Sequence, residues 1–416
     1  MKGAEGKMKK VILPILLLVI LQLSCKEDGI TPPPKNNPPG WQEDIPWPSL
    51  DANPWPIHHG DAQFTGRSKY AGPQLGQVEW MIELPTTHLS NDSFLSPVIG
   101  ADSTIYFVSY KDTASPGSFL YALRFDGSIK WTFPLPSPTQ KNSSPPVLAS
   151  DGTIYVATWG DKLYAVNPDG TLKWEVSFAA STGIRSMMNL DKEGNLYAFA
   201  HNGVLYKFSK AGDTIWSLTL DNFGSSSSAV VFSPDGKAMY ITGRKLFAVS
   251  TDGVLLWNFD PTPNSETWST TPMTNFQGTI FLDFGFRRLT KDGDLFPIYN
   301  WTDSISLIPD YIDQTIDKTG NVMIGTDFEI ISVDYNGSLR WRKPYDLKSF
   351  FSLVCDKEGM TYFLTLDNNL TKIDSLGNQI WQLQLDGQYL YSPAIFNQRM
   401  FLGTVRGTKK YFYSIK

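Results

Sequence analysis

The stretch DGTIYVATWGDKLYAVNPDGTLKW, residues 151–174, contains the pattern that decides the fold. Two apolar runs, TIYVA and KLYAV, are separated by a polar turn, and a second turn leads to a run that ends at Trp174. Short runs of this kind, bounded by Gly, Asn and Asp, are typical of β-strands joined by tight turns. The stretch therefore predicts three antiparallel strands in succession.

The same pattern recurs eight times along the chain. The residues at the centre of the TIYVA-like run, spaced 49, 42, 43, 41, 42, 39 and 39 residues apart, are Tyr106, Tyr155, Tyr197, Tyr240, Phe281, Met323, Tyr362 and Phe401. An apolar run such as SPVIG at residue 96 precedes them, and a Gly turn followed by Trp closes most units, for example Gly170/Trp174. The fifth unit has Gly293–Phe296 in place of the Gly–Trp element. Four short strands about every 40 residues are the sequence pattern of a propeller blade.

The two ends of the repeat array complement each other. The last unit stops at Lys416 after its third strand, and an unmatched fourth-strand pattern, Gly76–Trp80, precedes the first unit. Pairing of Gly76–Trp80 with the C-terminal KKYFYSI run would complete the last blade and remove the open edges of the array. We therefore predict an all-β fold, an eight-bladed β-propeller with four-stranded antiparallel blades over residues 55–416.

The first residues have the pattern of an export signal. Lysines precede the apolar run Val11–Leu23, whose 13 residues are fewer than the roughly 20 of a transmembrane helix. Ser24–Cys25 resembles a bacterial lipobox, although Gln22 stands where such motifs usually carry Leu. We expect residues 1–24 to be a lipoprotein signal peptide and Cys25 to carry the lipid. The alternative is an ordinary signal peptide with an incidental cysteine.

Residues 25–54 predict a spacer between the lipid and the propeller. This segment is rich in proline, as in ITPPPKNNPPG and NPWP, and proline-rich chain extends by about 3 Å per residue. We expect it to be a lipid-anchored tether that docks near Trp55. Its first residues, Cys25-Lys26-Glu27-Asp28, resemble the export signal of Bacteroidetes-type surface lipoproteins, and the alternative is a solvated charged spacer.

Charge and cysteine content exclude some functions. The net charge is −5 and no basic cluster is present, whereas nucleic-acid binders carry a positive stripe. With Cys25 lipidated, Cys355 is the remaining cysteine, so no intramolecular disulfide forms. Cys355 lies in the apolar pattern SLVCD, which predicts a buried, unreactive thiol.

Two features of the chain resemble the PQQ-like propeller family. The first is the N-terminal motif WPIHHGDAQFTGRSKYAGP, Trp55–Pro73, and the second is the set of Gly-x-x-x-Trp strand ends, which resemble the tryptophan-docking repeats of that family. The resemblance covers Trp55 to the end. It implies either a quinoprotein alcohol dehydrogenase or a non-catalytic scaffold similar to the lipoprotein propeller of the outer-membrane β-barrel assembly machinery. The unit at 317–326 also resembles the sensory propellers of two-component regulators.

The sequence lacks the features that this resemblance implies for a dehydrogenase. Such enzymes typically use adjacent disulfide-bonded cysteines, a Ca²⁺ site and an Asp base, and no adjacent cysteines occur here. The acids at Asp191, Asp317 and Asp356 fall in turns, where we expect them to cap the backbone rather than supply the six to eight oxygens of a Ca²⁺ site. No metal-ligand spacing links the four histidines, which are His58, His59, His88 and His201. We expect no catalytic, cofactor-binding or metal-binding residues.

One rim of the predicted ring is better suited to a partner than the other. The turns between strands one and two and between strands three and four are short and uniform, whereas the other turns and the links between blades vary in length. Long loops are where function tends to lie. Trp159, Trp268 and Trp301 fall on this variable rim, and we select them as candidate binding residues, with packing of the rim as the alternative.

These features together predict a lipid-anchored, non-enzymatic binding or scaffold propeller at the bacterial outer membrane, on its periplasmic face or at the cell surface. The expected partner is a protein of the cell envelope, such as an outer-membrane β-barrel. A surface-exposed lipoprotein that binds a glycan or a protein is the alternative, and a PQQ-dependent dehydrogenase is the least favoured hypothesis.

Overall fold

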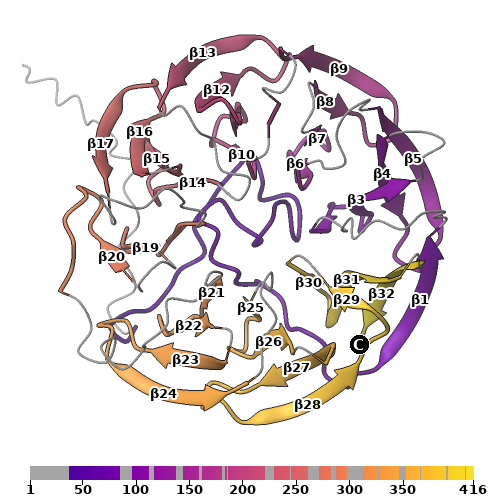
Figure 1. The fold of residues 1–416 in the computed structure, drawn as a ribbon, viewed down its shortest axis with the longest axis vertical. Coiled ribbons are helices and arrows are strands. Elements are labelled where there is room, and N and C mark those ends of the chain that lie inside the picture. The colour runs from indigo at the N-terminus through magenta and orange to yellow at the C-terminus, as the bar shows by residue number, and fades with distance from the viewer. Residues whose placement is uncertain are drawn as a thin grey trace, which may run out of the picture.

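Eight small antiparallel sheets surround a central axis in the computed structural model (Figure 1). The residues that the structure describes are 37–84, 96–111, 117–136, 144–158, 162–179, 183–184, 186–220, 229–243, 245–260, 271–282, 287–297, 313–326, 328–345, 353–365, 367–389, 392–407 and 409–416. Within them all 32 regular elements are strands, and no helix is long and apolar enough to cross a bilayer. The predicted eight-bladed propeller is confirmed.

Each blade is numbered here in chain order, and its strands run from the axis outward. Blades 1 to 4 consist of β2 (Val98–Ile99), β3 (Ile105–Lys111), β4 (Gly117–Leu123) and β5 (Ile129–Pro136); β6 (Val147–Leu148), β7 (Ile154–Ala157), β8 (Lys162–Val166) and β9 (Leu172–Ser177); β10 (Asn189–Leu190), β11 (Leu196–Phe199), β12 (Val204–Phe208) and β13 (Thr214–Thr219); and β14 (Val230–Phe232), β15 (Ala238–Thr242), β16 (Leu246–Ser250) and β17 (Leu255–Phe259). Blades 5 to 7 consist of β18 (Met273–Thr274), β19 (Ile280–Leu282) and β20 (Arg287–Leu289); β21 (Asp313–Ile316), β22 (Val322–Gly325), β23 (Glu329–Val333) and β24 (Leu339–Pro344); and β25 (Val354–Cys355), β26 (Thr361–Leu364), β27 (Asn369–Ile373) and β28 (Gln379–Gln384).

Blade 8 closes the ring with both ends of the chain. It combines β30 (Ala394–Phe396), β31 (Arg399–Arg406) and β32 (Lys409–Ile415) with β1 (Val78–Leu84), and β29 (Gln388–Tyr389) adds a fifth strand beside β31. Strand β1 pairs antiparallel with β32, so that Met81 lies opposite Tyr413. The predicted closure is confirmed, although the strand extends four residues beyond Trp80.

Blade 5 departs from the four-stranded pattern. Within the described residues it has three strands, and an isolated bridge between Leu289 and Leu295 stands where other blades have a fourth strand. Leu295 belongs to Gly293–Phe296, the segment that replaces the Gly–Trp element in this unit.

Each docking tryptophan joins its blade to the next one. Trp131 of β5 packs on the turn of blade 2, where its indole Nε1 donates to the Pro168 carbonyl oxygen at 3.0 Å. Gly170 in that turn has a φ of +87°, and a Cβ there would lie 2.7 Å from the Trp131 ring. Only glycine satisfies both the backbone conformation and the close approach. The Gly–Trp repeat in the sequence is therefore a repeat of blade-to-blade contacts.

The N-terminal chain crosses the middle of the ring before it reaches β1 (Figure 1). We call residues 41–77 the strap. Side chains of its first half, Trp47 and Leu50, are each 2% exposed and belong to the same apolar core as the inner strands of blades 2 to 4. Residues 41–54, which the sequence analysis placed in the tether, therefore pack against the propeller, because aromatic and aliphatic side chains between the prolines find an apolar surface there. Residues 25–36 of the tether and the expected signal peptide lie outside the described residues.

Candidate functional site on the axial face

The strap makes two passes over the rim that carries the turns between strands one and two. On the first pass, Gln42 bonds to the main chain of Lys318 in blade 6, at 2.9 Å, and accepts from the Phe276 amide in blade 5, at 2.8 Å. Trp47 donates to the Leu190 carbonyl oxygen of blade 3 at 2.7 Å, and Asn53 donates to Ala149 of blade 2 at 3.0 Å. The first pass thus runs from blade 6 back to blades 2 and 1.

The second pass visits the blades in forward order. Main-chain amides at the inner end of the blades donate to successive strap carbonyl oxygens. The donors are on the inner strands in six of these bonds, namely Ile99 to Trp55, Leu148 to Pro56, Phe232 to Ala62, Thr274 to Gln63, Ile316 to Thr65 and Cys355 to Gly66. In blade 8 the donor is Gln398, in the turn after β30, and the acceptor is Ala71. The amide of the Asn189 side chain in blade 3 donates to Ala62 at 3.0 Å. Every blade therefore holds the strap by at least one hydrogen bond, each worth a net of about 1 kcal/mol.

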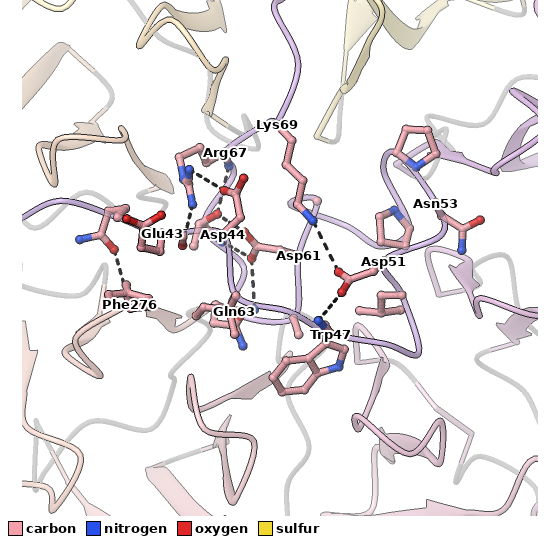
Figure 2. A pocket seen from close by; sticks show the side chains of 18 residues that line it. Glu43, Asp44, Trp47, Asp51, Asn53, Asp61, Gln63, Arg67, Lys69 and Phe276 are labelled. Atoms are coloured by element: carbon pink, nitrogen blue, oxygen red, sulfur yellow. Dashed lines mark hydrogen bonds and ion pairs between the residues drawn. The ribbon is translucent and has the colours of Figure 1, made fainter. Parts of the chain in front are cut away.

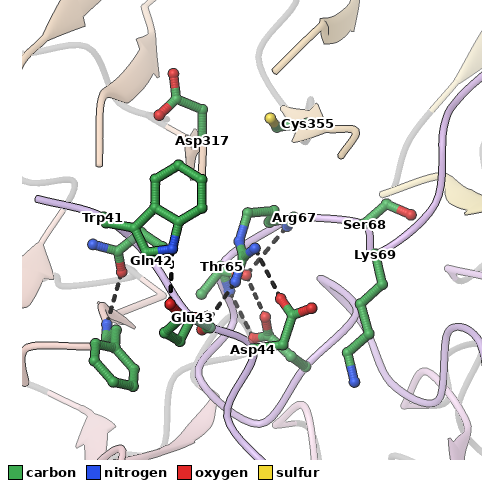
Figure 3. A network of polar contacts seen from close by, with 12 residues as sticks. Trp41, Gln42, Glu43, Asp44, Thr65, Arg67, Ser68, Lys69, Asp317 and Cys355 are labelled. Atoms are coloured by element: carbon green, nitrogen blue, oxygen red, sulfur yellow. Dashed lines mark hydrogen bonds and ion pairs between the residues drawn. The ribbon is translucent and has the colours of Figure 1, made fainter. Parts of the chain in front are cut away.

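An ion-pair network connects the two passes of the strap (Figure 3). Arg67 of the second pass lies 2.9 Å from the Asp44 carboxylate of the first pass and donates to the Glu43 carbonyl oxygen at 3.2 Å. Within the second pass, Asp61 accepts from the amides of Gln63 and Thr65 at 3.1 and 3.0 Å. Burial raises the pKa of Asp61, and the bonds from Thr65 together with the charge of Arg67 oppose that rise. The network holds the two passes together across the axis.

A small cavity lies between the two passes (Figure 2). Its volume is about 40 Å³, and strap residues line it together with Phe276. A single water occupies at least ~10–15 Å³ on this measure, so the space suits a few waters. Pockets that bind organic ligands measure roughly 300–1,000 Å³. This cavity therefore has no room for an organic ligand.

The aspartates at 191, 317 and 356 cap turns, as predicted. Asp317 Oδ1 accepts from the amides of Thr319 and Asn321 at 2.8 and 2.9 Å, and Asp356 Oδ1 accepts from those of Glu358 and Met360 at 2.9 and 3.0 Å. Within the described part of the chain, no three His, Cys, Asp or Glu side chains gather in a way that could hold a metal ion.

His58, His59 and Cys355 are packed into the structure, whereas His201 is half-buried in the turn before β12. His58 Nδ1 lies 2.6 Å from Ser96 Oγ, and burial, followed by the neighbouring His59, holds the pKa of His58 well below its usual value. His59 lies 3.5 Å from Asp313 of blade 6. Cys355 is fully buried and burial raises its pKa well above the usual value, so the predicted unreactive thiol is consistent with its surroundings. His88 lies outside the described residues.

The candidate rim residues Trp159, Trp268 and Trp301 lie outside the described residues, as does Cys25. The structure adds Phe328, which follows β22 on the same variable rim and is 64% exposed. Beside it, Glu329 forms a two-pronged ion pair with Arg342. An open hollow of about 510 Å³ lies on the same rim between β31 and β32, lined by Arg406, Gly407, Lys409 and Tyr411.

The comparisons with known proteins agree with this architecture. A family model described as outer membrane protein assembly factor BamB matches residues 120–281. These residues, which extend from blade 1 to blade 5, are similar to the repeats of that family. No curated protein matches the sequence.

The BamB-like repeats occur in a fold that solved structures share at low identity. BamB from Moraxella catarrhalis is 14% identical with a TM-score of 0.58, over 80% of this chain and 100% of its own. Quinohemoprotein alcohol dehydrogenase from Comamonas testosteroni is 12% identical with a TM-score of 0.65, over 88% and 81%. A europium-containing methanol dehydrogenase is 12% identical with a TM-score of 0.62, over 86% and 90%. At this identity the likeness establishes the fold alone.

The dehydrogenase neighbours require a test of whether a quinone fits among the described residues. The cavity of about 40 Å³ under the strap is far smaller than a multi-ring cofactor needs. The adjacent cysteines implied by the resemblance are missing from the sequence, and the turn carboxylates already accept backbone hydrogen bonds. The residues at this face do not fit a quinone cofactor.

The first pass of the strap was not predicted from the sequence. The signal that could have revealed it is the presence of Trp41 and Trp47 among the prolines, since a solvated spacer has no use for large aromatic side chains. Lys318 lies over the Trp41 ring at 5.2 Å, and Lys192 lies over the Trp47 ring at the same distance. Both contacts join residues far apart in the sequence, which no local pattern predicts.

Proposed function

We propose that this protein is a non-enzymatic scaffold of the bacterial outer membrane, anchored by lipid at Cys25, which binds an envelope protein on its variable rim. The observation that carries the proposal is the strap. Because residues 41–77 cover the axial part of one face, through bonds to all eight blades, the variable rim is the face whose axial part the strap leaves uncovered. The BamB-like repeats at 120–281 support an envelope role.

The partner is proposed to be an outer-membrane β-barrel protein, and exposed aromatic residues are suited to contact it. Aromatic side chains are enriched among residues that dominate protein–protein binding. Phe328 is the described representative on this rim, and Trp159, Trp268 and Trp301 are the further candidates.

Affinity purification in mild detergent tests this proposal. Wild-type protein is expected to recover a barrel protein, and Phe328→Glu is expected to reduce that recovery about tenfold, as for a moderate hot spot. The matched control is Leu376→Glu on the strap side, because Leu376 is 61% exposed and Phe328 is 64% exposed. No recovered barrel protein, or an equal loss with both variants, would contradict the proposal.

The anchor is tested separately at the mature N-terminus. Mass spectrometry is expected to find an acylated Cys25, and Cys25→Ser is expected to release the protein from the membrane fraction. An unmodified N-terminal residue in the wild-type protein would remove the anchor from the proposal without affecting the rim.

A surface-exposed lipoprotein that binds a glycan or a protein is the second candidate, and Cys25-Lys26-Glu27-Asp28 favours it. Protease treatment of intact cells distinguishes the two locations, because a periplasmic protein survives and a surface protein is degraded. For the dehydrogenase hypothesis, we expect no oxidation of alcohols or sugars after addition of PQQ and Ca²⁺.

A further inference from the structure

Among the blades for which the structure describes four strands, blade 8 is the one whose third and fourth strands are not consecutive in the chain. In blades 1 to 4, 6 and 7 a Gly turn joins them directly, whereas in blade 8 the third strand, β32, ends at Ile415 and the fourth strand, β1, begins at Val78. The place of the turn is taken by Lys416 and the strap. The amides of Leu75 and Gln77 donate to the Lys416 carbonyl oxygen, each at 3.2 Å. The covalent turn is thus replaced by non-covalent contacts.

The strap packs against the neighbouring blade in the same way as a Gly turn does. In blade 4 the Trp216 ring of the preceding blade packs on Gly253, where a Cβ would lie 3.0 Å away. At the same place in blade 8, Trp381 packs on strap residue Gly76, where a Cβ would lie 2.6 Å away. Both glycines have a positive φ, of +84° and +63°. Gly76 therefore occupies the position of the turn glycine.

Blade 7 forms hydrogen bonds with the strap at Gly72 and Pro73, just before Gly76. Asp356, which is fully buried, accepts from the Gly72 amide at 3.0 Å and from the Tyr362 hydroxyl at 2.8 Å. Lys372 Nζ, whose residue is 3% exposed, donates to the Pro73 carbonyl oxygen at 3.0 Å. A Cβ at Gly72 would collide with the Tyr362 hydroxyl. The site therefore accepts this backbone segment closely and specifically.

We propose that Asp356, Tyr362 and Lys372 form a latch for Gly72–Pro73 that replaces the missing turn and sets the register of β1 on β32. Register matters here because a one-residue slip exchanges the two faces of a strand. In the observed register Glu79 contacts Arg399 at 2.5 Å and Ser414 at 3.0 Å. A slip would lose both contacts and expose the face that carries Trp80.

Blade 3 provides a matched control for the latch, because it has the same three residue types in the same places. Asp191 lies 3.1 Å from the Tyr197 hydroxyl and 3.3 Å from Lys207 Nζ, and its side chain is 1% exposed. Lys207, however, donates to the Thr251 carbonyl oxygen in the covalent turn of blade 4, at 3.2 Å. The blade 3 group thus contacts a turn that is already covalent, and the blade 7 group contacts the strap.

Hydrogen–deuterium exchange on the full chain tests the latch. Asp356→Asn is expected to speed exchange of the amides at 74–84 by about tenfold or more, as expected for loss of a hydrogen bond to a charged group. Asp191→Asn is expected to leave those amides at the wild-type rate. An equal increase with both variants, or no increase with Asp356→Asn, would overturn the proposal.

A second variant covers the case in which Asp356→Asn does not fold. Lys372→Met keeps most of the buried side-chain volume and removes the bond to Pro73. It is expected to speed exchange at 74–84, whereas Lys207→Met is not. Trypsin cleavage after Lys69, whose side chain is 47% exposed, gives an independent measure of strap release. Wild-type cleavage in Lys372→Met, together with wild-type exchange, would also overturn the latch.

Discussion

Blades 2 and 7 come from the same repeat, but they use its charged positions differently. In blade 2 the turn after the inner strand begins with Ala149, and its acid, Asp151, is two positions later. The Asp151 side chain is 52% exposed and lies 3.3 Å from Lys173 Nζ on the outer strand. In blade 7 the acid is at the first position, as Asp356, and is fully buried.

The lysine differs in the same way. Lys173 of blade 2 is on the fourth strand and forms a pair at the surface, whereas Lys372 of blade 7 is on the third strand and bonds to the strap. An exposed ion pair contributes roughly 0–1 kcal/mol, whereas a buried polar group that loses its hydrogen-bond partner costs roughly 1–3 kcal/mol. With the acid two positions earlier and the lysine on the third strand, blade 7 has an internal attachment point where blade 2 has a surface ion pair.

The largest expected effect is on the stability of two alanine variants. Asp356→Ala leaves the Tyr362 hydroxyl, the Gly72 amide and two turn amides without their acceptor. Each unsatisfied buried donor costs roughly 1–3 kcal/mol, so we expect a total loss of about 3 kcal/mol or more. Asp151→Ala is expected to cost about 1 kcal/mol or less. Urea unfolding of both variants measures the difference, and similar losses would show that the two turns are equivalent after all.

The docking tryptophans of the two blades give a smaller contrast. Trp174 Nε1 of blade 2 donates to the Lys210 carbonyl oxygen at 2.9 Å, whereas Trp381 Nε1 of blade 7 is buried with no partner among the described residues. Trp174→Phe should therefore lose about 1 kcal/mol more than Trp381→Phe, the value of one hydrogen bond. Thermal unfolding of the two variants tests this order, and the reverse order would contradict it.

The smallest effect concerns the pH dependence of the blade 2 pair. Burial raises the pKa of Asp151, but the bonds from Thr153 and the charge of Lys173 outweigh it, and the pKa lies below its usual value. A lowered pKa in the folded state contributes stability above the unfolded pKa, about 3.9, and this contribution is lost as the pH falls through the folded pKa. The stability difference between the wild type and Asp151→Asn should shrink on acidification. The control is the same comparison in a Lys173→Met background. There the stability difference between the proteins with and without Asp151→Asn should depend less on pH because the charge of Lys173 is missing.

Several elements of the molecule could be predicted because their signals are local. The Gly–Trp spacing predicted the strand that closes each unit, since a turn glycine and a tryptophan lie at fixed positions in most repeats. The unmatched ends, Gly76–Trp80 and the C-terminal run, predicted closure of blade 8. The last repeat supplies only three of the four strands of a blade, and its open edge needs the N-terminal strand. The turn position of Asp317 predicted a backbone cap.

Other elements could not be predicted because they depend on residues brought together by the ring. The first pass of the strap relies on contacts such as Trp47 with Leu190 and Gln42 with Phe276, whose partners are more than 140 and 230 positions away. Proline-rich composition indicated a spacer and concealed these contacts. The latch could not be predicted for the same reason. In the sequence Asp356 and Lys372 have the pattern of ordinary turn and strand residues, and only the folded chain places Gly72 and Pro73 beside them.

The sequence by itself determined the number of blades, their order and the closure of the ring, because periodic glycines, aromatic residues and turn acids act within one repeat or between adjacent repeats. Tertiary structure alone decided that the N-terminal chain lies across the axis and fills one face. The physical reason is that the inner strands present their unpaired backbone groups toward a common centre, and only the closed ring brings those groups within reach of one segment.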